Sequence, residues 1–413
     1  MQKLFLSRIN KICAVFIVAW ICWPWLSQNT GLIGGALFAG VWCISAMAMN
    51  FRCTVGIDGA LMFFYVLYIS TSFFLTGRVH VNYPLYYHVS MVSMFFVPFY
   101  MARFYIRTNE KKFMGQLALI AVVCMIVGSL TSSYYTHVDP NIMKTISQAK
   151  DTEFIEYRKV GIGSFGFIYM LVIAIIAVVG QFKTRFLVGH TWVKVLLIFM
   201  CVAGINCIID STFTTALLLS VFGIVLILIT QENKAINFIT YIIAFVLLIF
   251  LSQLIGSWLS TITLESEDVT TRLREIGNLI MGNEGGENTE SRMEYFMKSV
   301  TCFTNHPIFG YNFAHKPPSP PGNHSEWIDI FAVYGLLGGI PLLTTLILKL
   351  KETARAIMQS KDFPFYTVIL IVFVVYGFLD PFLHLYNLGF VMFLFVPCCN
   401  CISYIFDKKG DLN

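Results

Sequence analysis

Long apolar stretches with few charges recur along the whole chain and are separated by shorter polar segments. A helix needs about 20 residues to cross the hydrocarbon core of a bilayer. The pattern therefore predicts an all-α polytopic integral membrane protein with about 12 transmembrane helices, in a single membrane domain over residues 1–413. The predicted spans lie near residues 11–26, 31–49, 57–76, 87–106, 112–131, 161–180, 192–209, 212–230, 236–259, 325–349, 364–379 and 386–406.

The composition supports this fold class and excludes several others. Of the 413 residues, 57% are hydrophobic and only 12% are charged, whereas a soluble domain carries about 25% charged residues. A soluble enzyme, a nucleic-acid-binding protein and a secreted disulfide-rich domain are therefore excluded. The continuous apolar runs also exclude an outer-membrane barrel. The 11 cysteines lie mostly in or beside apolar runs, so we expect no disulfide framework, no metal site and no cofactor.

Basic residues are unevenly distributed between the two sides of the predicted bundle. Most of the 28 lysines and arginines lie in short segments on the side that both termini share. The positive-inside rule therefore predicts cytoplasmic N- and C-termini. The first apolar run follows Lys3, Arg8 and Lys11 without a small-residue cleavage site, so we expect an uncleaved first helix. The opposite, outer side carries two long loops, at 132–160 and 260–324.

The second long loop contains a predicted interfacial helix at 288–303. Apolar residues recur there at helical spacing, which gives one apolar stripe suited to a membrane surface: Met293, Phe296, Met297 and Val300. Arg292 falls on another face, and Arg272 and Arg274 lie upstream in the same loop. Guanidinium groups match phosphate oxygens bidentately, so these arginines either bind a phosphate or pyrophosphate, or form a solvated face neutralised by nearby glutamates.

The end of this loop combines a helix start with a histidine. Asn323 is a suitable N-cap residue, and Glu326 follows three positions later as in a capping box. His324 would then be the first helical residue, where free backbone N–H groups favour an anion and disfavour imidazolium. The alternative is that Asn323 and Glu326 merely cap a helix and that His324 is a hydrated interfacial residue.

Other outer segments offer weaker candidates. Arg158 directly precedes the glycine-rich segment 161–166 and could face the same cavity. The short turns at 210–215 and 380–384 either bind sugar hydroxyls or simply end helices. The histidines outside residues 324 and 384 show no spacing that predicts a site.

Four segments resemble the O-antigen polymerase/O-antigen ligase superfamily: Ser-Arg-Met-Glu-Tyr at 291–295, His-Pro-Ile-Phe-Gly-Tyr at 306–311, Gly-Asn-His-Ser-Glu-Trp-Ile-Asp at 322–329 and Tyr-Gly-Leu-Leu-Gly-Gly at 334–339. The resemblance implies a GT-C-like integral membrane glycosyltransferase of the bacterial inner membrane. Such enzymes act on the periplasmic side, without metal, on glycans linked to undecaprenyl diphosphate. By resemblance, His324 matches the catalytic loop histidine and Arg292 the arginine that binds the donor pyrophosphate, with Arg158 as a second ligand.

Within this superfamily the residues favour a polymerase. Ligases usually carry an arginine in a short outer turn, but the turn at 210–215 has no basic residue. The expected partners are lipid-linked donor and acceptor oligosaccharides, membrane lipid and a chain-length regulator protein, with no nucleic acid. His324 would accept the acceptor's proton, or Glu326 or Asp329 would, while Arg272 and Arg274 assist Arg292. The alternatives are a ligase that transfers the glycan to lipid A–core and a lipid-linked oligosaccharide flippase.

Overall fold

The structure is a computed structural model. It describes the chain apart from residues 1, 55, 80–83, 140, 149–159, 186–190, 232, 234–235, 238, 244–245, 247–251, 264–266, 282–286, 315–319, 358–362 and 407–413. The described residues form helices and connecting segments, without strands. Eight of these helices are long and apolar enough to cross a membrane, and three shorter apolar helices accompany them. The chain is therefore a polytopic α-helical membrane protein, as its hydropathy predicts.

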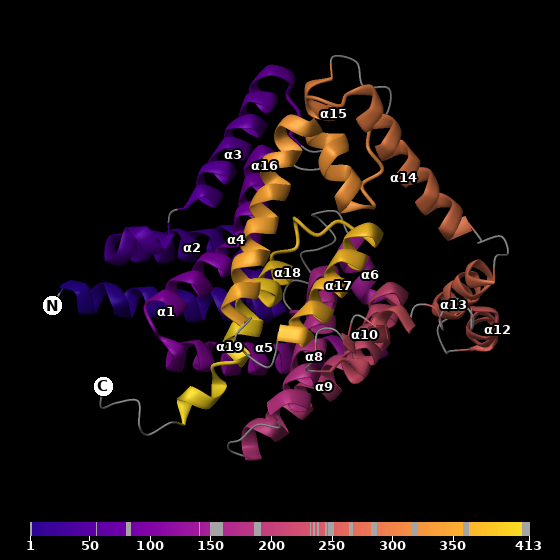
Figure 1. Ribbon diagram of the computed structural model, residues 1–413, viewed down its shortest axis with the longest axis horizontal. Coiled ribbons are helices and arrows are strands. Elements are labelled where there is room, and N and C mark those ends of the chain that lie inside the picture. Colours follow the sequence, from indigo (N-terminus) through magenta and orange to yellow (C-terminus); the bar gives the residue numbers. More distant parts are fainter. Residues whose placement is uncertain are drawn as a thin grey trace.

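The N-terminal helices form one side of the molecule (Figure 1). A short break at Trp23 separates α1 from α2, and the two pack along each other. Gly31 has φ 63°, a left-handed conformation that interrupts α2 near its start. The bounds in this half are α1 Gln2–Cys22, α2 Pro24–Thr54, α3 Ile57–Thr76, α4 Leu85–Arg107, α5 Lys111–Val138 and α6 Ile142–Gln148.

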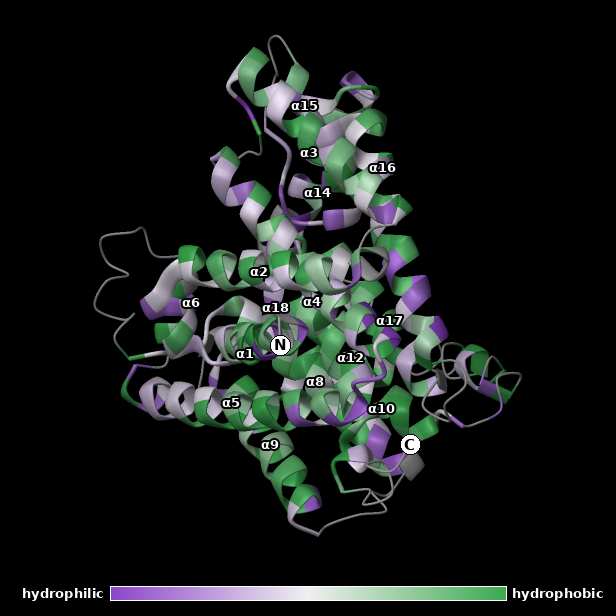
Figure 2. Cartoon of the chain, turned by 90° about the vertical axis from the view of Figure 1, so that its left-hand side faces the viewer, coloured by the Kyte–Doolittle hydropathy of each residue, from purple (hydrophilic) through white to green (hydrophobic). Residues whose placement is uncertain are grey.

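Helix α8, Phe165–Arg185, lies at the centre of the bundle. Of its most apolar window, 83% is buried inside the protein, as expected for a helix that is apolar all round. Helices α9, Thr191–Asp210, and α10, Thr214–Ile229, pack against it. Figure 2 shows that α8 and α9 consist mostly of hydrophobic residues. The first residues of α8 and α10 line the cavity described below.

The C-terminal region contains a broken helix. Helix α16, Glu326–Ile357, is interrupted at Gly335, which has φ 59°. The backbone there is paired with a neighbouring segment, because Leu336 N donates to Pro307 O at 2.8 Å and Leu337 N donates to Ile308 O at 3.0 Å. Irregular backbone at membrane depth is tolerated where protein satisfies it in this way.

The remaining C-terminal elements are α17 Phe363–Leu379, α18 Tyr386–Phe390, the π-helical turn Val391–Phe395, α19 Val396–Cys399 and the 3₁₀ turn Ile402–Ile405. They pack on different helices: α18 and the π-helical turn on α4, α17 on α16, α10 and α8, and α19 and the 3₁₀ turn on α5. Gly389 lets α18 approach α4 closely, since an added Cβ would lie 2.0 Å from the carbonyl oxygen of Phe95. The predicted final span at 386–406 is one apolar helix, Tyr386–Cys399, with a π-helical stretch inside it, followed by a 3₁₀ turn.

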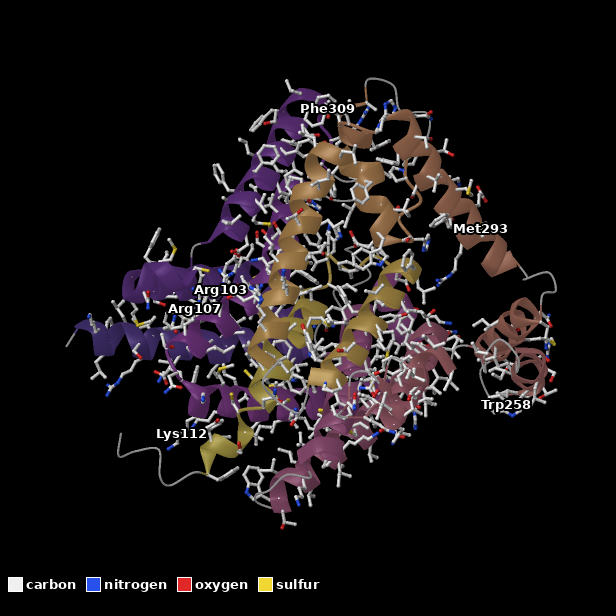
Figure 3. All side chains as sticks on the ribbon, in the orientation of Figure 1. Arg103, Arg107, Lys112, Trp258, Met293 and Phe309 are labelled. Carbon is white, nitrogen blue, oxygen red and sulfur yellow. The ribbon has the colours of Figure 1, made fainter. Side chains whose placement is uncertain are left out.

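The predicted loop 260–324 is largely helical where it is described. It carries the end of α12 Ser252–Thr261, then α13 Glu267–Ile280, α14 Glu287–Asn305 and α15 Gly310–Phe313. Helix α14 corresponds to the predicted interfacial helix at 288–303. Met293 and Met297 on its apolar stripe are 62% and 50% exposed, and Figure 3 shows Met293 on the outer side of this helix. Ser299 and Cys302 are buried, on the face that packs against α16.

Several predicted boundaries differ from the structure. The first helix begins at Gln2 and ends at Cys22, not at 11 and 26, because its polar N-terminal turns continue the helix. Helix α5 extends to Val138, seven residues beyond the predicted 131, into the predicted loop 132–160. The predicted span 236–259 falls partly outside the described residues, and its end overlaps α12.

Candidate functional site

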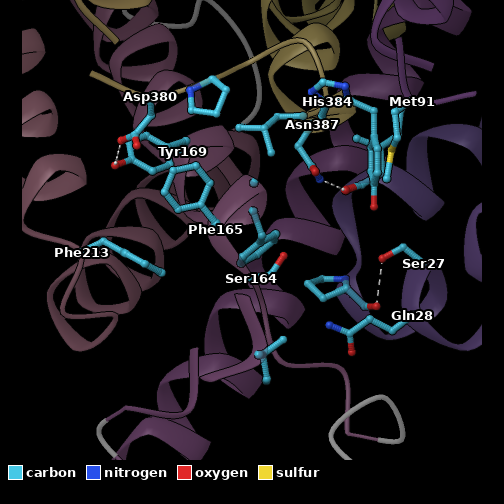
Figure 4. Close-up of a pocket in the computed structure, with 18 of the residues that line it drawn as sticks. Ser27, Gln28, Met91, Ser164, Phe165, Tyr169, Phe213, Asp380, His384 and Asn387 are labelled. Atoms are coloured by element: carbon cyan, nitrogen blue, oxygen red, sulfur yellow. Dashed lines mark hydrogen bonds between the residues drawn. The ribbon is translucent and has the colours of Figure 1, made fainter. Parts of the chain in front are cut away.

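A cavity of about 700 Å³ opens where α1, α2, α4, α8, α10 and α14 converge on the turn that follows α17 (Figure 4). Many of its walls are aromatic, which suits the apolar faces of a ligand such as a sugar. The polar and charged side chains in its lining come from segments far apart in sequence. They include Gln28, Lys144, Arg292, Asn323, Asp380 and His384.

Arg292 extends from α14 into the lining of this cavity. Its Nη1 donates a hydrogen bond of 3.1 Å to the carbonyl oxygen of Leu379 at the end of α17. This contact uses one of the five N–H donors of the guanidinium. A fixed positive charge with further donors is suited to an anionic ligand such as a diphosphate.

Asp380 follows Leu379 and lies in the same wall, 7% exposed. Burial raises the pKa of its carboxyl to about 6, although the Arg292 charge and a hydrogen bond from the Tyr169 hydroxyl act in the opposite direction. The Tyr169 hydroxyl lies 3.5 Å from Asp380 Oδ2. The carboxyl therefore gains and loses its charge close to neutral pH, beside the arginine.

His324 lies next to the cavity-lining residue Asn323 and against α14. Its ring packs on Tyr295, with ring centroids 4.6 Å apart and planes inclined by 32°. Its Nδ1 is buried without a hydrogen-bond partner among the described residues. Burial and the Arg292 charge lower the pKa of the imidazole. These two effects, and not the helix N-terminus expected from the sequence, favour the neutral imidazole, which is able to accept a proton.

The predicted helix start at Asn323 is wrong. Asn323 has φ 57°, a left-handed conformation, and α16 begins at Glu326. Ser325 is the N-cap, because its carbonyl accepts the Asp329 N–H and its own N–H donates to Asp329 Oδ2, both at 2.8 Å. The Asp329 carboxylate, one turn into the helix, thus fixes the boundary two residues later than predicted. His324 precedes the helix.

Glu326 and Asp329 take part in hydrogen bonds that join separate segments. Glu326 Oε2 accepts from the backbone N–H groups of Phe382, at 2.6 Å, and Leu383, at 3.0 Å. Asp329 Oδ1 accepts from the hydroxyl of Ser299 on α14 at 2.5 Å. The two residues are 5% and 3% exposed. They hold the 380–385 turn and α14 against α16, and neither is among the cavity-lining residues.

Of the other predicted arginines, the structure describes the side chain of Arg274, which is not among the cavity-lining residues. Arg274 is exposed on α13, which packs mainly on α12 through Leu273 and Leu259. The backbone of Arg272 lies in α13, but its side chain is outside the described residues. Arg158 also lies outside them. Of the arginines predicted from the sequence, Arg292 is the one the structure places in the cavity lining.

Two histidines that the sequence did not single out as a pair meet at the cavity wall. His384 Nε2 lies 2.7 Å from His88 Nδ1. His88 Nε2 lies 2.7 Å from the Tyr65 hydroxyl and 3.0 Å from the Tyr334 hydroxyl. The histidines are 296 positions apart in sequence. The sequence alone indicated only that His384 lies in an outer turn, at 380–384, and it gave no signal for His88.

The described part of the chain contains no group of three or more His, Cys, Asp or Glu side chains that could hold a metal ion. Its cavity instead offers an arginine, a carboxyl group whose pKa is raised to about 6, the imidazole of His384 and aromatic walls. This set is suited to binding an anionic, sugar-bearing ligand and to moving a proton. In comparisons with known proteins, no family model and no curated protein matched the chain.

Proposed function

We propose that the protein is a polysaccharide polymerase that joins oligosaccharide repeat units linked to undecaprenyl diphosphate. It acts as a metal-independent glycosyltransferase of the GT-C type on the periplasmic side of a bacterial inner membrane. In this proposal the chain crosses the membrane about twelve times, with both termini in the cytoplasm. The product is an O-antigen or a related surface glycan, and a chain-length regulator protein is a proposed partner.

The observation that carries the proposal is the position of Arg292 and His324. The arginine lines a large cavity at the ends of apolar helices, and its charge acts on the neighbouring histidine. A lipid diphosphate needs an apolar surface for its chain and a cation for its phosphates. The exposed apolar stripe of α14, which carries Arg292, supplies a surface for the lipid.

The proposed reaction is a direct displacement. The hydroxyl of the acceptor sugar attacks the anomeric carbon of the donor, and the bond from that carbon to the diphosphate oxygen breaks. Arg292 stabilises the negative charge that develops on the leaving diphosphate. His324 accepts the proton of the attacking hydroxyl, and such general-base assistance contributes about 10²–10⁴-fold in rate. The displacement inverts the anomeric configuration.

Glu326 and Asp329 have a different role in this proposal. Their carboxylate oxygens accept hydrogen bonds within the protein, so they position α14 and the 380–385 turn. The proposed proton acceptor is His324, whose Nδ1 has no partner among the described residues. Glu326 and Asp329 differ from it in this respect, because their carboxylate oxygens already accept hydrogen bonds from the protein.

The test compares Arg292→Ala and His324→Ala with Arg274→Ala, an exposed arginine outside the cavity lining. Each variant replaces the wild-type gene in the native host, and its lipopolysaccharide is separated on a gel at matched protein levels. We expect the first two to leave core bearing a single repeat unit and the control to give a normal ladder. Normal ladders from both Arg292→Ala and His324→Ala would overturn the proposal.

The same gel separates the alternative functions. A ligase defect leaves bare core, and a flippase defect leaves lipid-linked units on the cytoplasmic side. The sequence resemblance favours the polymerase, because the turn at 210–215 contains no arginine. If Arg292→Ala leaves bare core, the result would identify the protein as a ligase and not as a polymerase.

A further inference from the structure

The cavity has two ends of different chemistry. Asp380, Tyr169 and Phe213 lie at one end of the view in Figure 4, and Ser27, Gln28 and Met91 lie at the other. Arg292 belongs to the first end, because it bonds to Leu379 O and its charge acts on Asp380. His384 lies along the upper edge of this view, between Asp380 and Met91. Gln28 and His384 line the same cavity as Arg292 and bring uncharged hydrogen-bonding groups to it.

The imidazole of His384 is oriented by hydrogen bonds to a series of buried polar groups. Its Nε2 is hydrogen-bonded to His88 Nδ1 at 2.7 Å, and His88 is 0% exposed. Behind His88 lie the hydroxyls of Tyr65 and Tyr334, both fully buried. Buried polar chains of this kind are costly unless each member is satisfied. Their presence here orients one imidazole at the cavity wall.

Gln28 is held in a comparable way. Its Nε2 donates to the carbonyl of Ile162 at 2.6 Å, which fixes the orientation of the amide. Its Oε1 has no hydrogen-bond partner among the described residues. An unpaired buried amide oxygen is unfavourable in the empty protein. A ligand hydroxyl at this end of the cavity would donate to it.

These groups are neutral hydrogen-bonding groups, in contrast to Arg292. A sugar hydroxyl both donates and accepts hydrogen bonds, so it matches an amide oxygen and an imidazole. Tyr386 and Trp20 also line the cavity and lie against each other, with ring centroids 4.5 Å apart. The wall near His384 therefore combines polar groups with aromatic surface, as sugar-binding sites require.

We propose that Gln28 and His384, which both line this cavity, bind the acceptor sugar through its hydroxyl groups and orient it for attack on the donor. His88, Tyr65 and Tyr334 are positioning residues that act through His384. This inference rests on the proposed function, because it assigns the acceptor site of that reaction. Arg292 and the acceptor site then hold the two substrates in one cavity, which removes much of the entropic barrier to their reaction.

The experiment uses the purified full-length protein in nanodiscs and two probes. The first probe is sugar-free undecaprenyl diphosphate. The second is the oligosaccharide released by mild acid from the lipid-linked repeat units that accumulate in a host lacking this gene. Binding of each probe is measured by isothermal titration for Arg292→Ala, His384→Ala, Gln28→Ala and the control His137→Ala, which changes an exposed histidine outside the cavity lining.

We expect His384→Ala and Gln28→Ala to weaken oligosaccharide binding about tenfold, which corresponds to about 1.4 kcal/mol, and to leave undecaprenyl diphosphate binding unchanged. Arg292→Ala should show the opposite pattern, and His137→Ala should resemble the wild type. If His384→Ala and Gln28→Ala bind the oligosaccharide normally while Arg292→Ala loses diphosphate binding, the acceptor site is wrong and the proposed function stands. If no variant affects either probe, the proposed function fails as well.

The positioning role of His88 has its own readout. His88→Leu removes the bond to His384, whereas His88→Gln keeps a group able to hydrogen-bond. In polymerisation of extracted repeat units, His88→Leu should raise KM for the repeat unit more than it lowers kcat, and His88→Gln should restore most of the loss. Equal falls in activity for both variants, with unchanged KM, would contradict a positioning role.

Discussion

The Nζ of Lys349 lies 2.8 Å from Oδ2 of Asp58, and the two side chains are 0% and 5% exposed. Arg103 Nη2 lies 3.1 Å from Oδ1 of the same carboxylate and also pairs with Glu352. These residues come from α3, α4 and α16. Charged groups within membrane-spanning helices are costly unless they pair, so this cluster ties three helices together in a defined arrangement.

We predict that Lys349→Met lowers the free energy of unfolding by about 3–5 kcal/mol, because it leaves the Asp58 carboxylate with one buried partner fewer. The measurement is chemical unfolding of the purified protein in detergent. Lys351→Met, on an exposed side chain of the same helix, is the control and should change little. The double variant Lys349→Met/Asp58→Asn should recover part of the loss, and a double variant as unstable as the sum of the single variants would contradict the pairing.

The Asp380 carboxyl predicts a pH dependence of ligand binding. Its pKa is raised to about 6, so the group is neutral below that pH and negative above it. The negative charge opposes an anionic diphosphate in the same cavity. Binding of the lipid-linked repeat unit should therefore strengthen by about three- to tenfold as pH falls from 7.5 to 5, as expected for one charge in a partly polar cavity.

His324 contributes to this dependence in the same direction. Its lowered pKa means that it becomes positive at more acidic pH and then also favours the anion. Asp380→Asn should bind the ligand more tightly than the wild type at pH 7.5. The remaining pH dependence should be weaker and lie at more acidic pH, because it comes from His324 alone. The measurement is a set of binding isotherms in the wild type and this variant. An unchanged pH dependence in Asp380→Asn would show that Asp380 does not face the ligand.

The contact between Tyr295 and His324 predicts how α14 influences catalysis. The Tyr295 ring covers the imidazole at a centroid distance of 4.6 Å. Tyr295→Ala should free the histidine and lower polymerisation by about tenfold or more, since misplaced catalytic groups lose their geometric advantage. Tyr295→Phe keeps the ring and should retain activity. Activity is measured with extracted repeat units in membranes, and equal losses in both variants would instead point to the hydroxyl.

The membrane architecture was readable from sequence because hydropathy is a local property. The span predicted at 57–76 coincides with α3, and those at 192–209 and 212–230 match α9 and α10 within two residues. Helix ends were less predictable, since polar turns such as the start of α1 continue the helix beyond the apolar run. The helix start predicted at Asn323 was wrong because the Asp329 carboxylate accepts the N–H of Ser325 and so sets the helix start there.

The candidate site was only partly readable from sequence. Arg292 and His324 lie in one long outer loop, and the family resemblance pointed to both as site residues. The pairing of His384 with His88 joins α4 to a turn 296 positions away, and no local pattern encodes such a distance. Arg274 lies in the same loop as Arg292 but does not line the cavity, because α13 packs on α12. The sequence did not distinguish these two arginines.

The break in α16 predicts a large effect of a small substitution. Gly335 has φ 59°, and a Cβ added there would lie 2.3 Å from the carbonyl oxygen of Ile308. That oxygen already accepts the N–H of Leu337, so it cannot move without breaking the pairing that satisfies the interrupted helix. Gly335→Ala should therefore destabilise the protein by about 3 kcal/mol or more.

Gly40→Ala is the matched control for this substitution. Gly40 lies in α2 with nothing within 4 Å of an added Cβ, and alanine favours a helix over glycine by about 1 kcal/mol. Folded yield and unfolding temperature in detergent should fall for Gly335→Ala and stay level or rise for Gly40→Ala. A stable, active Gly335→Ala protein would mean that α16 runs through this point as a continuous helix. The segment 307–310 would then be displaced from it, together with the Tyr68 hydroxyl that bonds to Phe309 and Tyr334.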